Sequence, residues 1–340
     1  MKTINYYVTG HTAKGKVNYI QSNIKDINDI ITLHHPSNRL KTAILQTTLK
    51  QYNGNELELI LHPLSKDYLA GFICREKSSA ILIDELGIDA GRKIDLTEYV
   101  VVDETEAEMY ENQIEHVLNS AYQAFERGLK IHDDLEAVFL KEMNFHKADD
   151  LAYDLIDGLF KDIQKKNKQS KFVKRLFGTN TPEGMTNQLA VLTEQVGKRY
   201  FIKGRAGTGK SHLMKQVLAK CEAYGLDVEI YHCSFDPDSI DMLIIRELDC
   251  CLFDSTDPHA LDPNRDDDEV IDMYEKTVRH GTDEKYETEI ERITKQYKGE
   301  MKKGLNILSE IKSIDQKKEA MITEEVIQTM SAHFQDILNI

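Results

Sequence analysis

No apolar run in this chain of 340 residues approaches the roughly 20 residues that cross a membrane, and the amino terminus leads into a polar stretch instead of a secretion signal. The 5 cysteines form no C-x-x-C pair, so they indicate neither a disulfide framework nor a zinc knuckle. These absences argue against a membrane-spanning or disulfide-stabilised protein. We therefore expect a cytoplasmic protein that does not engage a membrane.

Positive charge is also scarce. The 43 lysines and arginines stand against 58 aspartates and glutamates, which gives a formal net charge of -15 at pH 7. Such a chain repels polyanions, so we do not expect nucleic acid among its partners. One basic segment, from Lys161 to Arg175, interrupts this pattern. We interpret it as a solvated helix end and linker at a domain boundary, and the alternative is a patch that follows phosphates.

The chain does contain an internal repeat. Its length predicts about two domains, and segments of the first half recur about 170 residues later. The matches include Thr12-Ala13-Lys14-Gly15 with Thr181-Pro182-Glu183-Gly184, Leu59–His62 with Glu229–His232, and Ala80–Asp84 with Cys250–Asp254. We therefore divide the chain into two homologous domains, 1–168 and 169–340.

Each half has the same order of expected elements: a strand, a helix, a strand, an apolar segment, a strand that ends in Asp, and then long helices. In the second half we expect strands at Arg199–Lys203, Asp227–Cys233 and Asp249–Asp254, and a helix at Ser211–Tyr224. Strand, helix and strand within about 35 residues form a βαβ unit, which implies a parallel sheet. The expected fold class is therefore α/β, with two domains that each carry a parallel sheet flanked by helices.

The region from Asp283 onward has apolar residues three or four positions apart. This spacing predicts a helical arm with one apolar stripe. We expect the stripe to pack as core or as a helical hairpin, and the alternative is a surface that binds a protein partner.

The segment from Gly204 to Ser211 is a complete phosphate-binding loop, Gly-Arg-Ala-Gly-Thr-Gly-Lys-Ser, between an expected strand and an expected helix. Glycines permit the conformations that point several N–H groups at one phosphate, and the helix start favours an anion. Lys210 can reach the β and γ phosphates, and Ser211 can bind Mg²⁺. We assign nucleotide binding to Gly204, Arg205, Ala206, Gly207, Thr208, Gly209, Lys210, Ser211 and His212.

Mg²⁺ in such a site also needs a carboxylate at the end of a neighbouring strand. Asp254 closes the apolar run Cys250–Phe253 and is our candidate for this role, beside Ser211. The alternative for Asp254 is a capping or turn role.

The equivalent segment of the first half, His34–Thr42, contains no glycine. It retains the Lys41-Thr42 step, but we expect its bulky residues and extra length to prevent a phosphate-binding loop from forming. The sequence therefore predicts a degenerate, pseudo-NTPase domain at 1–168 and a single nucleotide site at 169–340.

Comparison of the two halves also sorts residues, because those lost together with the loop are candidates for the site. Asp236, Asp238 and Asp241 stand opposite Lys66, Tyr68 and Gly71, and the first half lacks the Pro258-His259 step. Thr181, Gly184, Asn187 and His232 are retained as Thr12, Gly15, Asn18 and His62, so we interpret them as structural. Ligands of open α/β folds bind at the carboxyl end of the sheet, where Asp236, Asp238 and His259 are expected. They are candidates for a general base or a second-substrate contact, and the alternative for the aspartates is turn and capping chemistry.

The chain resembles an uncharacterised bacterial family of tandem P-loop ATPase-like proteins. The resemblance covers nearly the whole chain and rests on the T-x-x-G turn at Thr181, the phosphate loop, the segment His232–Ser239 and the segment Asp254–His259. It implies ATP binding with no assigned substrate. Both halves can carry an intact loop in that family, so His34–Thr42 is a departure that argues against a two-site mechanism.

We therefore expect a Mg-ATP-binding P-loop NTPase, with ATP as the default nucleotide. The first interpretation is an ATPase whose catalytic residues are Lys210, Asp236, Asp254 and His259. The second is a nucleotide or small-molecule kinase in which Asp236 or Asp238 holds the acceptor hydroxyl. The third is a non-enzymatic, nucleotide-gated protein whose helical arms bind a protein partner. Many ATPases place a Glu directly after the strand-end Asp, whereas Ser255 stands there in this chain.

Overall fold

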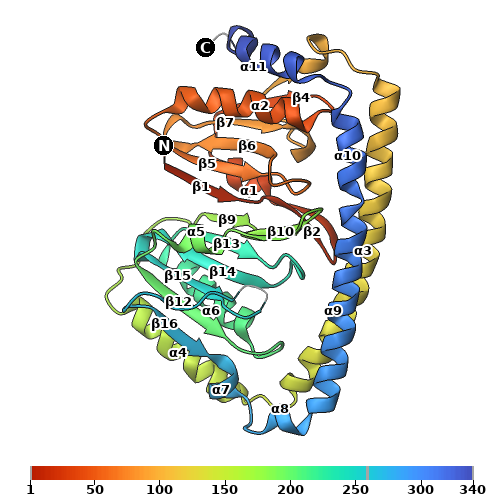
Figure 1. The fold of residues 1–340 in the computed structure, drawn as a ribbon. Helices are drawn as coiled ribbons and strands as arrows, with labels where there is room; N and C mark the ends of the chain where they lie inside the picture. The colour runs from red at the N-terminus through yellow and green to blue at the C-terminus, as the bar shows by residue number, and fades with distance from the viewer. Residues whose placement is uncertain (1, 258–259, 339–340) are drawn as a thin grey trace.

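The computed structural model describes residues 2–257 and 260–338 and contains two α/β units of the same design (Figure 1). The first half forms β1 (Lys2–Tyr6), β2 (Thr9–Thr12), β3 (Gly15–Asn18), α1 (Ile20–Ile24), β4 (Asp29–His34), α2 (Asn38–Leu49), β5 (Glu56–Leu61), β6 (Leu69–Cys74), β7 (Ser79–Ile83), β8 (Arg92–Asp95), α3 (Glu104–Leu140) and α4 (Phe145–Phe160).

The second half repeats the order of strands. It forms β9 (Phe172–Arg175), β10 (Gly178–Thr181), β11 (Gly184–Asn187), α5 (Leu189–Thr193), β12 (Lys198–Lys203), α6 (Lys210–Tyr224), β13 (Val228–His232), β14 (Ile240–Ile245), β15 (Cys250–Asp254), β16 (Glu269–Asp272), α7 (Met273–Thr277), α8 (Thr282–Lys285), α9 (Glu287–Ser309), α10 (Ile311–Glu319) and α11 (Glu324–Leu338). Its helices differ, because two short helices, α7 and α8, precede its long arm, and the arm is divided into α9 and α10. Within these described residues, no helix has the length and apolar composition needed to cross a membrane.

Each unit is built on a six-stranded sheet, in the order β1-β5-β6-β7-β4-β8 and β16-β12-β15-β14-β13-β9. The α/β class is confirmed, but the expected parallel sheet is wrong in one respect. The apolar segment Ile240–Ile245 is itself a strand, β14, and pairs antiparallel with both β13 and β15. The strand β12 still pairs parallel with β15 and β16, so the ends of β12 and β15 meet at one edge of the sheet.

The spacing of the repeat changes along the chain. Asp29 pairs with Ser79 and Lys198 pairs with Cys250, so the offset is 169 at β4 and 171 at β7. The shift arises between the loop lysine and the next strand, because α6 runs on to Tyr224 whereas its twin α2 ends at Leu49. Our matches of His62 with His232 and of Asp84 with Asp254 are therefore wrong by one residue. The structural twin of Asp254 is Ile83.

The two halves exchange their terminal helices. Helix α4 of the first half packs on α6 of the second half, and its Ala152 and Phe160 join the core formed by Leu213, Met214 and Val217. Helix α11 of the second half packs on α2 of the first half, and its Met330 and Phe334 join the core around Leu40 and Ile44. The globular units therefore do not coincide with 1–168 and 169–340, because each half supplies a helix to the other.

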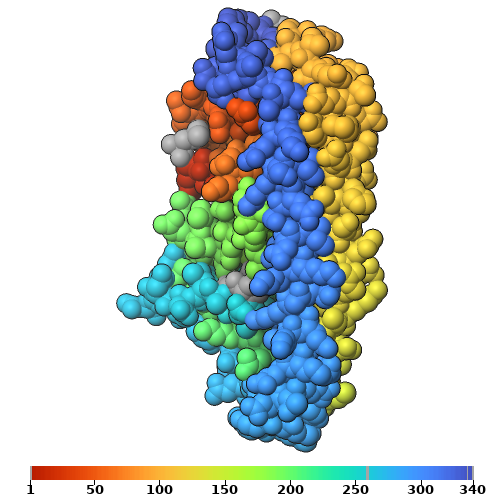
Figure 2. Space-filling view, turned by 45° about the vertical axis from the view of Figure 1, so that its right-hand side comes forward, coloured from red at the N-terminus to blue at the C-terminus, as the bar shows by residue number. Residues whose placement is uncertain are grey.

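Two long helical arms carry this exchange. Helix α3, which spans roughly 55 Å at 1.5 Å per residue, runs antiparallel to α9 and α10 along both units (Figures 1 and 2). Small residues bring the helices together: a Cβ on Gly304 would clash with the ring of Phe125, and Gly128 faces the sulfur of Met301. The apolar stripe after Asp283 thus packs as a helical pair, on the arm of the other half.

The amino-terminal strands of the two halves meet near the middle of the molecule. Tyr7 and Leu176, which are equivalent at an offset of 169, donate their backbone N–H groups to each other's carbonyl oxygens at 3.0 and 2.8 Å. This reciprocal pair lies on an approximate two-fold axis that relates the halves. The hairpins β2–β3 and β10–β11 pack together beside it, where His11 N donates to Thr179 Oγ1 at 3.0 Å.

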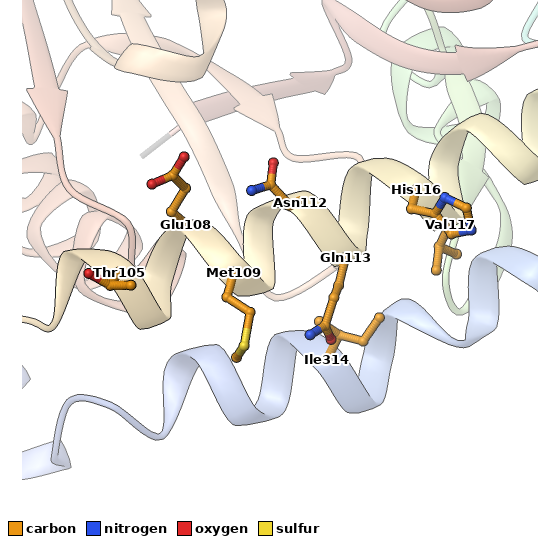
Figure 3. Close-up of a pocket in the computed structure, with 8 residues that line it drawn as sticks. All are labelled: Thr105, Glu108, Met109, Asn112, Gln113, His116, Val117 and Ile314. Atoms are coloured by element: carbon orange, nitrogen blue, oxygen red, sulfur yellow. The ribbon is translucent and has the colours of Figure 1, made fainter.

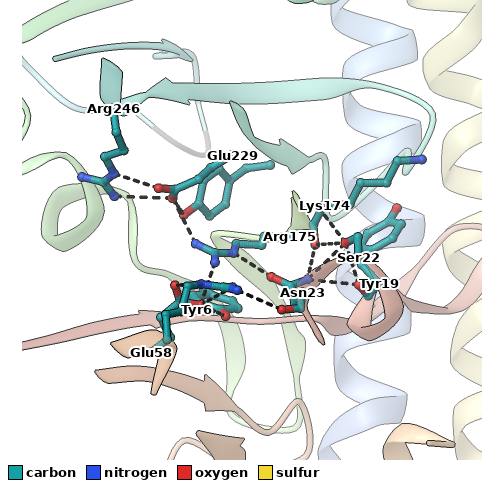
Figure 4. Close-up of polar contacts among 11 residues, drawn as sticks. Tyr6, Tyr19, Ser22, Asn23, Glu58, Lys174, Arg175, Glu229 and Arg246 are labelled. Carbon is teal, nitrogen blue, oxygen red and sulfur yellow. Dashed lines mark hydrogen bonds and ion pairs between the residues drawn. The ribbon is translucent and has the colours of Figure 1, made fainter. Parts of the chain in front are cut away.

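A buried ion network crosses the same interface (Figure 4). Arg175 is 2% exposed and its guanidinium contacts Glu58 at 2.8 Å and Glu229 at 3.0 Å, while Arg75 and Arg246 hold the outer sides of these two carboxylates. Although burial opposes ionisation, the guanidinium groups of Arg175 and Arg75 lower the pKa of Glu58 to about 2. The end of the basic segment is therefore a buried connection between the halves, and our interpretation of Arg175 as part of a solvated linker is wrong.

Candidate functional site

The segment Gly204–Ser211 lies between the end of β12 and the start of α6 and is held open by glycine. Gly207 and Gly209 have φ values of +71° and +83°, a region that side chains with a Cβ rarely occupy. A Cβ on Gly204 would clash with Oγ1 of Thr208, which donates to the carbonyl oxygen of Arg205 at 2.9 Å. Helix α6 has no side-chain cap at its start, so its first N–H groups remain available to an anion.

Two side chains of this segment point at the edge of the sheet. Lys210 Nζ donates to the carbonyl oxygen of Arg205 at 2.8 Å and lies 3.6 Å from Oδ2 of Asp254 on β15. Ser211 Oγ accepts a hydrogen bond of 3.0 Å from the backbone N–H of Ile240, the first residue of β14. The structure therefore brings Lys210, Ser211 and Asp254 together, as the motif predicts. His212 is exposed and its Nε2 lies 2.8 Å from Gln216, away from this group.

Asp241 adds a second carboxylate, which the comparison of the two halves marked as a candidate but to which we assigned no role from the sequence. It precedes Met242, which pairs with Phe253, so Asp241 and Asp254 stand side by side on β14 and β15. Burial and the charge of Asp254 raise the pKa of Asp241 to about 7. Lys210 Nζ lies near both carboxylates, and its positive charge partly offsets the rise in the pKa of Asp241. The sequence contains two signals for Asp241: it lies inside an apolar run, and the first half has no carboxylate at the equivalent position.

These donors suit a small hard cation. Carboxylate and hydroxyl oxygens are the ligands that Mg²⁺ prefers, and it is commonly held by one or two carboxylates together with phosphate oxygens and water. Asp241, Asp254 and Ser211 would provide that set. Within the described part of the chain, no group of three or more His, Cys, Asp or Glu side chains is placed to hold a metal ion.

Helix α3 of the first half forms one wall of the loop. The tip of the loop touches it so closely that a Cβ on Gly207 would lie 2.6 Å from the carbonyl oxygen of Glu136. The charge of Lys210 acts on Glu136 and on His132, which lies one helical turn earlier. Burial raises the pKa of Glu136 and lowers that of His132. The candidate site is therefore composed of both halves of the chain.

Asp236 and Asp238 lie in the turn between β13 and β14. Asp236 Oδ1 accepts from the N–H of Asp238 at 3.3 Å, just as Ser65 Oγ accepts from the N–H of Asp67 at 3.2 Å in the first half. At the observed offset of 171, Asp67 is the twin of Asp238, so this aspartate was not lost with the loop. Both second-half carboxylates also bind Lys14 of the β2–β3 hairpin, at 2.7 and 2.5 Å. These contacts match the turn alternative. His259 lies outside the described residues.

In the first half, the segment His34–Thr42 is as long as its twin, contrary to our expectation of extra length. Helix α2 begins at Asn38, three positions earlier than α6 relative to the repeat, and Ser37 Oγ caps it by accepting from Leu40 N at 3.1 Å. The carboxylate of Glu319, from α10 of the second half, accepts from the N–H groups of Asn38 at 2.7 Å and Arg39 at 3.3 Å. A carboxylate thus occupies the helix start that is open in the second half.

Lys41, the twin of Lys210, is 1% exposed and forms ion pairs with Asp84 at 3.2 Å and Glu85 at 2.7 Å. It is therefore part of the folded core and is not available to a phosphate. This arrangement gives the physical reason for a first half that keeps the Lys-Thr step without the loop.

Two hollows lie away from the loop. One is an open groove of about 630 Å³ between α3 and α10, which is lined by Met109, Val117, Ile314 and neighbouring polar residues (Figure 3). The other is a cavity of about 380 Å³ at the carboxyl end of the first sheet. Neither includes a residue of Gly204–Ser211.

Comparison with known proteins gives no further guide, because no family model, curated protein or solved structure matches the chain.

Proposed function

We propose that the second half binds Mg-ATP through Gly204–Ser211 and hydrolyses it. The observation that carries this proposal is the open loop between β12 and α6, where Gly207 and Gly209 adopt left-handed conformations and the helix start lacks a side-chain cap. Free N–H groups at a helix start favour an anion such as phosphate. The twin helix α2, which has its N–H groups occupied, shows that the fold does not otherwise require an uncapped start.

Each charged residue near the loop has a role in this proposal. Lys210 would give up its hydrogen bond to the carbonyl oxygen of Arg205 and bind the β and γ phosphates instead. Ser211, Asp254 and Asp241 would hold Mg²⁺. When bound, Mg²⁺ neutralises charge that develops on the transferred phosphoryl group.

The helix α3 suggests how nucleotide would act on the rest of the molecule. Because Gly207 contacts the backbone of Glu136, a loop that closes on phosphate would press on the arm that crosses to the first half. This contact favours an ATPase whose nucleotide state is transmitted through the arms.

The test combines thermal stability with turnover. Mg²⁺ with ATP, GTP or ADP is added to the full chain, to Lys210→Ala and to a control, Lys215→Ala, which alters an exposed lysine of the same helix. A nucleotide at 100 times its dissociation constant stabilises the folded state by about 2.7 kcal/mol, so we expect Mg-ATP to raise the Tm by roughly 4 °C. Lys210→Ala should remove this shift, and the control should keep it.

Phosphate release from Mg-ATP alone would support hydrolysis. Turnover that requires an added hydroxyl acceptor would favour the kinase interpretation, and stabilisation without turnover would favour a nucleotide-gated interaction protein. If no nucleotide stabilises the full chain, the loop does not bind nucleotide and the proposal fails.

A further inference from the structure

The cavity at the carboxyl end of the first sheet is enclosed by both halves. Its volume is about 380 Å³, which is within the range of small-molecule sites. The hairpin strand β2 contributes His11, the start of α2 contributes Asn38, and α10 of the second half contributes Lys318. Ile114 and Leu118 of α3 form an apolar wall. The cavity therefore combines one apolar side with polar groups from three separate elements.

Two of these polar side chains have buried atoms without hydrogen-bond partners among the described residues. Asn38 is 2% exposed and both atoms of its amide are unpaired, and His11 is 1% exposed with Nε2 unpaired. The other ring nitrogen of His11 lies 2.7 Å from the hydroxyl of Tyr122. Leaving buried polar atoms unpaired destabilises a fold, because the hydrogen bonds that they made with water are lost. The unpaired atoms of Asn38 and His11 line one cavity, where a bound ligand can supply the missing hydrogen-bond partners.

Among the buried residues that line the cavity, the charge without a partner is positive. Glu111, Glu115 and Lys16 also line it, but at exposed positions where water screens their charges. Asp84 and Glu85 are both paired with Lys41, and His34 and His62 contact the same two carboxylates at 2.7 and 3.1 Å. Lys318, by contrast, is 4% exposed, and within the described chain its ammonium group has no hydrogen bond or ion pair. A buried lysine without a counter-ion favours an anionic group beside it.

This lining is not a remnant of the nucleotide loop. At the offsets of the repeat, the twins of Asn38, His11 and Lys318 are Gly207, Asn180 and Leu135. The offset is 169 for His11 and Asn38, and 183 for the arms, because Glu319 contacts Asn38 as Glu136 contacts Gly207. None of the three residues is therefore the same as its twin. In addition, Glu319 already occupies the N–H groups at the start of α2, where a loop-bound phosphate would bind.

We propose that the first half holds a second ligand site, which takes a small anionic metabolite with hydrogen-bonding groups on its body. Lys318 binds the carboxylate or phosphate of this metabolite. Asn38 and His11 bind its polar groups, and Ile114 and Leu118 pack against its less polar side. The site does not depend on nucleotide binding in the second half.

The experiment uses the full-length Lys210→Ala chain, so that binding at the phosphate loop does not contribute. Isothermal titration calorimetry with inorganic phosphate, ribose 5-phosphate, AMP and citrate separates phosphorylated from carboxylated ligands. We expect at least one of the four to bind one per chain with a dissociation constant below about 1 mM. Lys318→Met in the same background should weaken that binding about tenfold or more, whereas Lys317→Met, at an exposed position of the same helix, should not.

A second measurement guards against variants that fail to fold. Because Asn38 and Lys318 are held buried for a ligand, Asn38→Leu and Lys318→Met should each raise the Tm of the ligand-free chain while weakening binding. The proposal is overturned if none of the four probes binds, or if binding is unchanged in both Lys318→Met and Asn38→Leu.

Discussion

Gly207 carries two constraints at the tip of the phosphate loop. Its φ of +71° disfavours any residue with a Cβ, and a Cβ there would lie 2.6 Å from the backbone of Glu136. We expect Gly207→Ala to destabilise the chain by roughly 1 to 3 kcal/mol and to remove the Mg-ATP-dependent rise in Tm. Denaturant unfolding and thermal shift measure the two effects.

The matched control for Gly207 is Gly54→Ala. Gly54 also has a positive φ, +95°, but a Cβ there would meet no atom within 4 Å. This variant should lose about 1 kcal/mol from backbone strain alone and keep its response to nucleotide. Equal losses in the two variants would mean that contact with α3 does not matter.

The pH dependence of stability should contain a contribution from His11. Burial lowers the pKa of His11 to about 3 in the folded chain, against an ordinary value of 6.5. Between these values the unfolded chain binds a proton that the folded chain does not, so stability falls as the pH drops below 6.5. From pH 7 to pH 5 this term amounts to roughly 2 kcal/mol.

His11→Asn tests this contribution, because asparagine stands at the twin position, Asn180. The variant should lose less stability than the parent chain between pH 7 and pH 5, as measured by urea unfolding. The same loss in both proteins would show that His11 is not the group that titrates.

For individual residues, the sequence predicted the phosphate-binding loop but not all of the site around it. Gly204–Ser211 is contiguous, so its conformation follows from its own residues. Asp241 joins Asp254 only because β14 runs antiparallel to β15, and Glu136 joins them from 68 residues before the loop. Contacts that depend on strand direction or on a distant helix leave no local pattern to find.

The two helices that follow the twin loops differ in how they begin. Helix α2 is capped by Ser37 and by the carboxylate of Glu319, whereas α6 starts uncapped after Gly209. Carboxylates at a helix start stabilise it through N–H hydrogen bonds and the helix dipole. We therefore expect Glu319→Gln to lower the free energy of unfolding by about 1 to 2 kcal/mol, as measured by denaturant unfolding.

Glu136→Gln is the natural control, because Glu136 is the twin of Glu319 on α3 at an offset of 183. No described N–H group at the start of α6 donates to it. This variant should change stability by less than about 0.5 kcal/mol. A similar loss in both variants would contradict a capping role specific to Glu319.

Secondary structure was predicted within one residue for β12, β13, β15 and α6, since each is bounded by clear turn or loop residues. The direction of β14 was not predictable. A six-residue apolar run has no period that distinguishes strand from buried helix, and the βαβ rule assumes that neighbouring strands are parallel. The two extra residues between Lys210 and β13 also displaced the later strand matches, which is why Asp84 rather than Ile83 was set against Asp254.

The exchange of α4 and α11 could not be inferred from the sequence. Their spacing of apolar residues shows that each has one buried face, but not which surface covers that face. Helix α3 determines which surface α4 covers. Because α3 runs along both units, α4, which follows it in the chain, lies on α6 of the second half. By the approximate symmetry, α9 and α10 deliver α11 to α2 (Figure 1).

This exchange predicts what happens when the chain is divided at the repeat boundary. Residues 1–168 lack the helix that covers α2, and residues 169–340 lack the helix that covers α6. Each segment also loses its partner in the α3–α9 pair, so an extensive apolar surface is exposed on both. We expect each segment alone to self-associate or aggregate, and the two together to form a 1:1 complex that responds to Mg-ATP as the intact chain does. Light scattering after size-exclusion chromatography would show the complex, and a monomeric 169–340 segment that unfolds cooperatively at the Tm of the whole chain would contradict the exchange.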